Sequence, residues 1–146
     1  MFGFGFGELS IVFIICAVLI VPILYIFTLY KAIARCQVEN RAMPPILVWL
    51  LVVPVVDFFW HFVVVYKVAQ SFDNEFKARG IDKPPKPTLK IGMVMCFSQF
   101  LALIPRIEIF VAILVFILWI VYWVKVASLS SELIPEKTIQ ITEPTA

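Results

Sequence analysis

The residues best placed to do chemistry are Asp57 and His61, which lie within a long apolar run. Their spacing of four residues puts the carboxyl and imidazole groups on one face of a helix. Ionisable side chains in such a run are costly unless they face a partner or water, so the pair indicates a proton or ion pathway. The alternative is structural: Asp57 caps a helix and His61 hydrogen-bonds to it at an interfacial turn. The sequence leaves both interpretations open.

A second set of polar residues flanks the same run. Glu39 and Arg41 precede it, and Glu75 and Arg79 follow it with the spacing of one helical turn. We expect these four residues to dock onto one another at the cytoplasmic face or to contact a partner. They are the second candidate site.

Other catalytic or cofactor patterns are not found in the sequence. His61 is the only histidine, so one chain offers no bis-histidine ligation of haem. No C-x-x-C or H-E-x-x-H metal motif and no glycine-rich phosphate loop is present. No basic face is interleaved with exposed aromatic residues, as nucleic-acid binding would require. We therefore expect a non-enzymatic protein without cofactor, metal or nucleic acid.

The composition indicates that these polar residues are positioned by membrane helices. Of 146 residues, 62% are hydrophobic and 15% are charged, with a mean hydropathy of +1.01, whereas globular domains are roughly half apolar and about a quarter charged. The apolar residues form four runs, at about 9–33, 45–69, 88–104 and 107–125, with a polar loop at 70–87. We predict a single membrane domain over residues 1–131 and a polar, disordered tail over 132–146.

Proline positions determine how many of these runs cross a bilayer. Pro22 is expected to kink the first run without ending it. The third run reaches only about 25 Å, which is short but workable in a thinned or tilted arrangement. Pro54 divides the second run, which is either a kinked span or a re-entrant segment that folds back. The predicted fold class is an all-α, multi-pass transmembrane bundle with three full spans plus one re-entrant or Pro-kinked segment.

Charge placement favours the re-entrant alternative for residues 45–69. Both flanks of this segment, 31–41 and 67–90, are rich in Lys and Arg, and short basic loops stay on the cytoplasmic side. A single crossing would leave one of them outside. Re-entrance keeps both inside, with the N-terminus outside and the C-terminus inside.

A weak internal repeat supports the same topology. Pro54 with Asp57 resembles Pro105 with Glu108. In each pair the proline suits a first helical position and the carboxylate suits the first turn, where it interacts favourably with the helix dipole. We therefore expect a helix to begin at each proline.

Two family resemblances are visible in the sequence. The first is carried by Glu39-Asn40-Arg41-Ala42-Met43-Pro44-Pro45, Val48-Trp49-Leu50, Val53-Pro54, Trp60, Ser71-Phe72, Glu75-Phe76 and Arg79-Gly80. This pattern resembles a family of small uncharacterised bacterial membrane proteins, some fused behind a GYF-like domain, in which Asn stands where this chain has Asp57. The resemblance covers about residues 37–80 and implies a bacterial inner-membrane location but no activity. The opening residues are similar to twin-arginine translocase components, only as far as Pro22.

These observations give two functional hypotheses. The first is a non-enzymatic accessory or structural subunit of a larger bacterial membrane complex, or a self-associating helical bundle. Its partners would be the lipid bilayer and other membrane subunits or itself. The alternative is an oligomeric ion or small-solute pathway that uses Asp57 and His61.

Overall fold

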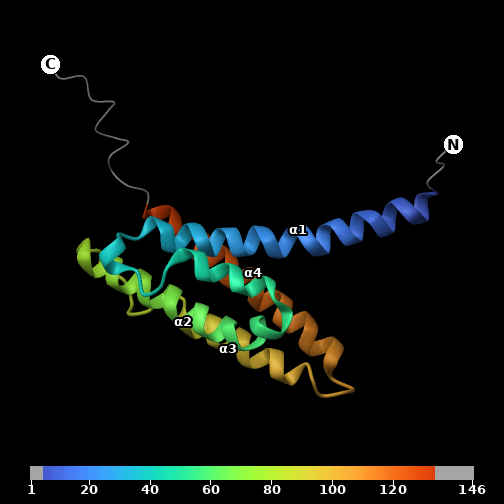
Figure 1. The fold of residues 1–146 in the computed structure, drawn as a ribbon. Helices are drawn as coiled ribbons and strands as arrows, with labels where there is room; N and C mark the ends of the chain where they lie inside the picture. The colour runs from blue at the N-terminus through green and yellow to red at the C-terminus, as the bar shows by residue number, and fades with distance from the viewer. Residues whose placement is uncertain (1–4, 134–146) are drawn as a thin grey trace.

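A computed structural model describes residues 5–133, and this part of the chain is helical with no strand (Figure 1). The elements in order are α1 (Phe6–Arg35), the 3₁₀ helices η1 (Val38–Asn40) and η2 (Pro45–Val52), α2 (Pro54–Ala78), α3 (Leu89–Leu101) and α4 (Glu108–Glu132). The all-α prediction is confirmed. The predicted tail begins at residue 132, where α4 still continues, and residues 134–146 lie outside the described part.

α1 has two halves with different surroundings. Its second half packs into the molecule through Tyr25, Ile26, Leu29, Ala32 and Ile33, which are all buried. Its first half has apolar side chains exposed on every face, and Figure 1 shows it diverging from the rest of the molecule toward the N-terminus. Pro22 lies close to the junction between the two halves.

Residues 45–69 fold back on themselves. The Trp60 Nε1–H donates to the Leu47 carbonyl at 2.9 Å, and the Ala42 backbone N–H donates to Ser71 Oγ at 2.9 Å. Because Leu47 lies beside Trp60 and the earlier Ala42 lies beside the later Ser71, the two bonds together show that η2 and α2 run antiparallel. The reversal occurs at Val53, whose backbone is extended, because the residue before a proline disfavours the helical conformation. The segment is therefore a helical hairpin and not one kinked helix.

Two of the described helices, α1 and α4, are long and apolar enough to cross a membrane. This is fewer than the three full spans predicted. The prediction that residues 88–104 form a full span is wrong, because the helix there is too short. α3 has only 13 residues, about 20 Å at 1.5 Å per residue. It ends because the chain turns between Ala102 and Ile107, where Arg106 has a φ of 84°, a conformation outside the α-helical region.

α3 lies between α2 and α4 in the core and approaches both closely. The contact is made at Gly92, where a methyl group would overlap the Val65 side chain and lie 2.9 Å from Cε2 of Tyr122. A glycine here lets three helices meet near one point. This packing sets the distance between the hairpin and α4, and both elements line the cavity beside Asp57.

Candidate functional site

Asp57 and His61 lie together in the first two turns of α2, as their spacing predicts. His61 Nδ1 is 3.5 Å from Asp57 Oδ1. The two side chains differ in exposure, since His61 is 6% exposed and Asp57 is 39% exposed. α2 begins here with Pro54 in its first turn and Asp57 as the acidic first-turn residue, positions that suit both residue types.

Tyr25 completes this group, although sequence reasoning did not identify it. Its hydroxyl lies 2.9 Å from His61 Nε2, across 36 residues of sequence. A tyrosine hydroxyl that donates to Nε2 leaves the imidazole proton on Nδ1, the nitrogen that faces Asp57. We call Tyr25, Asp57 and His61 the cavity cluster. In this tautomer the Nδ1–H faces the Asp57 carboxylate, which can only accept, but at 3.5 Å the two groups do not form a hydrogen bond.

Aromatic side chains of α4 hold Tyr25 in place. Its ring centroid lies 5.1 Å from that of Trp119 and 5.8 Å from that of Trp123. The Trp123 Nε1–H also donates to Thr28 Oγ1 at 2.9 Å. These contacts attach the second half of α1 to α4 and fix the tyrosine hydroxyl toward α2.

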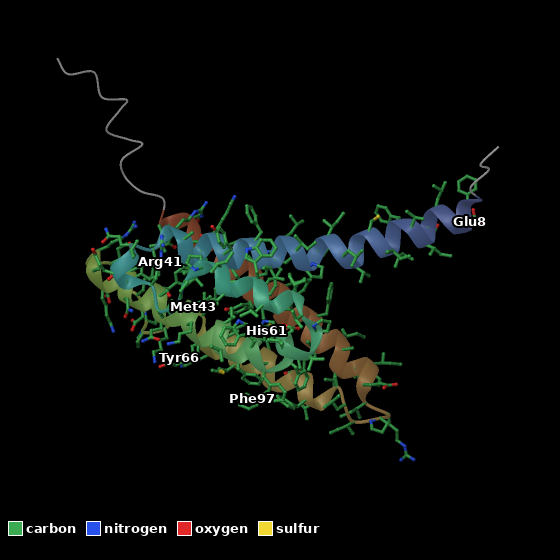
Figure 2. The ribbon with its side chains drawn as sticks, viewed as in Figure 1. Glu8, Arg41, Met43, His61, Tyr66 and Phe97 are labelled. Carbon is green, nitrogen blue, oxygen red and sulfur yellow. The ribbon has the colours of Figure 1, made fainter. Side chains whose placement is uncertain are left out.

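The cavity cluster borders a cavity of about 450 Å³ at the place where α1 leaves the bundle. The lining residues are Pro22, Tyr25, Ile26, Leu51, Asp57, His61, Gln99, Ala102, Ala112, Val115, Phe116 and Trp119. Among these, Asp57 is the only residue with a formal charge at neutral pH when the histidine is neutral. Figure 2 labels His61 in the middle of the molecule, far from both Glu8 and Arg41. The volume lies in the range of small-molecule sites.

The other predicted residues lie toward the opposite end of α2. Glu75 is fully buried and accepts hydrogen bonds from the Gln37 backbone N–H at 2.9 Å, Asn40 Nδ2 at 2.8 Å and Arg79 Nε at 2.7 Å. We call Gln37, Asn40, Glu75 and Arg79 the polar clamp. Burial raises the pKa of the Glu75 carboxyl, but these donors outweigh burial and hold its pKa below the ordinary value.

Arg41 and Glu39 have separate positions beside the polar clamp. Arg41 donates to the backbone carbonyls of Ile33, Ala34 and Cys36 at 3.1, 2.6 and 2.9 Å, carbonyls at the end of α1, where the helix itself supplies too few donors. Glu39 is exposed. The structure thus brings Glu75 and Arg79 together, uses Arg41 to cap α1 and leaves Glu39 at the surface.

Within residues 5–133, no group of three or more His, Cys, Asp or Glu side chains is arranged to hold a metal ion. A comparison with known protein families, curated proteins and solved structures gives no match. The functional assignment therefore rests on the geometry of the cavity, the two polar groups and the free half of α1.

Proposed function

We propose that this protein is a non-enzymatic integral membrane bundle that serves as an accessory or structural subunit of a larger membrane assembly, or that associates with copies of itself. The supporting observation is the first half of α1. Large apolar residues such as Phe13, Ile14 and Val18 are between 60% and 76% exposed there. In a bilayer such a helix is available for side-by-side packing with another transmembrane helix, which depends on close van der Waals contact.

We further propose a topology in which the hairpin of residues 45–69 enters the bilayer without crossing it. Its first arm, η2, has eight residues, about 16 Å at the 3₁₀ rise of roughly 2 Å per residue. The polar clamp joins residues 37–40 to residues 75–79, which supports placing both basic flanks on one side. By the resemblance to small bacterial membrane proteins, that side is the cytoplasm of an inner membrane, with the N-terminus outside.

Cysteine labelling tests the topology. Cys16, Cys36 and Cys96 are first replaced by Ser, and single cysteines are then introduced as Val38→Cys or Lys77→Cys, both at exposed positions. A membrane-impermeant maleimide added to intact cells should label neither position, and in inverted vesicles it should label both. Labelling of only one of the two from outside would show a crossing between them and overturn the re-entrant topology.

Photo-crosslinking in native membranes tests the accessory role. A photoreactive residue at Ile14, which is 60% exposed on the free half of α1, should give an adduct with a second polypeptide. Ile113, which is 55% exposed on α4, is the matched control and should give less. Absence of any adduct along the free half of α1, together with a monomeric mass in mild detergent, would contradict the proposal.

The second candidate is an oligomeric ion or small-solute pathway that uses Asp57 and His61. It is favoured by one observation, which is that both residues line one cavity whose other lining residues are mostly apolar. Ion or solute flux through liposomes containing the purified protein should then fall in Asp57→Asn and His61→Ala. Flux equal to that of the native protein in both variants would remove this candidate.

A further inference from the structure

We propose that the cavity beside Asp57 binds an organic cation with an apolar body, meaning a quaternary ammonium, phosphonium or protonated amine group on a hydrocarbon or aromatic scaffold. The inference does not depend on the accessory role proposed above. It rests on the charge of the cavity, its aromatic wall, its side opening and an unpartnered buried atom of His61.

The charge of the cavity is that of a single carboxylate. In residues 5–133, the only basic group within ion-pair distance of Asp57 is His61, and no Lys or Arg lines the cavity. The imidazole is neutral when Nε2 accepts the Tyr25 hydroxyl proton, so it does not balance the carboxylate. A carboxylate among apolar residues is costly without a counter-charge. We therefore expect the cavity to favour a ligand that supplies the positive charge.

The walls of the cavity determine what kind of cation fits. Tyr25, Trp119 and Phe116 form a continuous row of rings, with centroids 5.1 Å apart for the first pair and 6.1 Å for the second. Ring faces attract weakly hydrated organic cations. A divalent metal ion instead requires several oxygen ligands, and the described residues offer no such group. The rest of the lining is mostly aliphatic, so it suits the apolar body of the ligand.

The cavity is open to a ligand that arrives from the hydrocarbon phase. Residues of α1 and α4 line it where the two helices separate, and the Asp57 side chain, which also lines it, is 39% exposed. Ala112 is part of the lining and is exposed and small. A cation with an apolar body partitions into a bilayer and reaches Asp57 sideways, whereas an inorganic ion does not.

A buried atom of His61 points toward the carboxylate without a full hydrogen bond. His61 is buried, and its Nδ1 has no hydrogen-bond partner although Asp57 Oδ1 lies 3.5 Å away. A small rotation of Asp57 would close this distance to an ordinary hydrogen bond. We assign His61 as a positioning residue that orients Asp57 toward the cation, with Tyr25 holding the imidazole in the correct tautomer.

The test uses two probes of the same shape and opposite charge, tetraphenylphosphonium and tetraphenylborate. The full chain is reconstituted in lipid nanodiscs, and binding is measured by equilibrium dialysis against protein-free nanodiscs. We expect saturable phosphonium binding at one site per chain and no saturable borate binding. Asp57→Asn should weaken phosphonium binding by about tenfold or more, because the electrostatic attraction between the carboxylate and the cation is lost.

Matched variants keep the outcome interpretable. Asp57→Glu preserves the charge and should retain binding, and Asp73→Asn removes a carboxylate that pairs with Lys77 far from the cavity and should bind as the native protein does. Ala112→Trp adds bulk at an exposed position, so it preserves the fold and should block the probe. Equal binding of both probes, or phosphonium binding unchanged by both Asp57→Asn and Ala112→Trp, would overturn the proposal.

Discussion

Asp57 and Glu75 lie on one face of α2, about five turns apart at roughly 3.6 residues per turn, yet their surroundings are opposite. Glu75 is fully buried and receives three hydrogen bonds from groups that converge on it. Asp57 is partly exposed beside a cavity, and its nearest partner is a histidine nitrogen at 3.5 Å. The carboxylate at one end of the helix therefore has its acceptor capacity filled, whereas the carboxylate at the other end does not.

The difference shows which of the two carboxylates is free to bind something else. A buried carboxylate with its donors in place contributes to the fold, and removing it leaves those donors unpaired. Asp57, by contrast, lies among apolar residues without enough hydrogen-bond donors. Polar groups that lack partners in this way are concentrated at functional sites. This contrast is why we propose a binding role for the cavity cluster and a structural role for the polar clamp.

The largest expected effect is at the polar clamp. Glu75→Ala leaves the Asn40 amide, the Gln37 N–H and the Arg79 guanidinium without their shared acceptor, so we expect a loss of about 3 kcal/mol in the free energy of unfolding. The measurement is reversible unfolding in mixed micelles, monitored by circular dichroism. Asp57→Ala is the comparison variant and should cost about 1 kcal/mol or less, because a partly exposed group loses little. Equal losses in the two variants would remove the distinction between the two ends.

A smaller effect is expected within the cavity cluster itself. Tyr25→Phe keeps the ring among its aromatic neighbours but removes the hydroxyl that contacts His61 Nε2. One hydrogen bond is worth about 1 kcal/mol in stability, so the same unfolding assay should detect a modest loss. The variant should also change the populations of the two neutral tautomers of His61, which nitrogen-15 chemical shifts of the imidazole report directly. An unchanged tautomer population would show that Tyr25 does not set the orientation of His61.

Much of the fold follows from patterns that the sequence displays locally. The apolar runs and the turn at Pro54 are local properties, since proline fixes its own backbone and restricts the residue before it. The spacing of Asp57 and His61 places them on one helix face in the same way. The basic flanks favour the fold-back of residues 45–69, because positively charged loops stay on the cytoplasmic side of a membrane.

Other features of the fold and of the site depend on contacts between segments that are distant in the sequence. Tyr25 reaches His61 only because α1 packs on α2, and its position in an aliphatic run gives one weak signal, a hydroxyl among apolar residues. The donors to Glu75 include the backbone N–H of Gln37, which no side-chain pattern reveals. α3 is shorter than its apolar run because the turn that includes Arg106 begins within that run, at Ala102. These features are set by packing between elements, which composition and periodicity do not encode.

The smallest expected effect is the pH dependence of the polar clamp. The pKa of Glu75 is lower in the folded protein than its ordinary value because its donors outweigh burial. Its stabilising contribution is therefore complete above the unfolded pKa of about 4.3 and is lost as the pH falls through the lower folded pKa. Melting temperatures of native protein and Glu75→Gln, measured between pH 7 and pH 3, should differ most at neutral pH and converge in acid. Asp73→Asn, which removes the partner of the exposed Lys77 on the same helix, should run parallel to the native curve. A native curve parallel to that of Glu75→Gln would show that the clamp does not depend on the charge of Glu75.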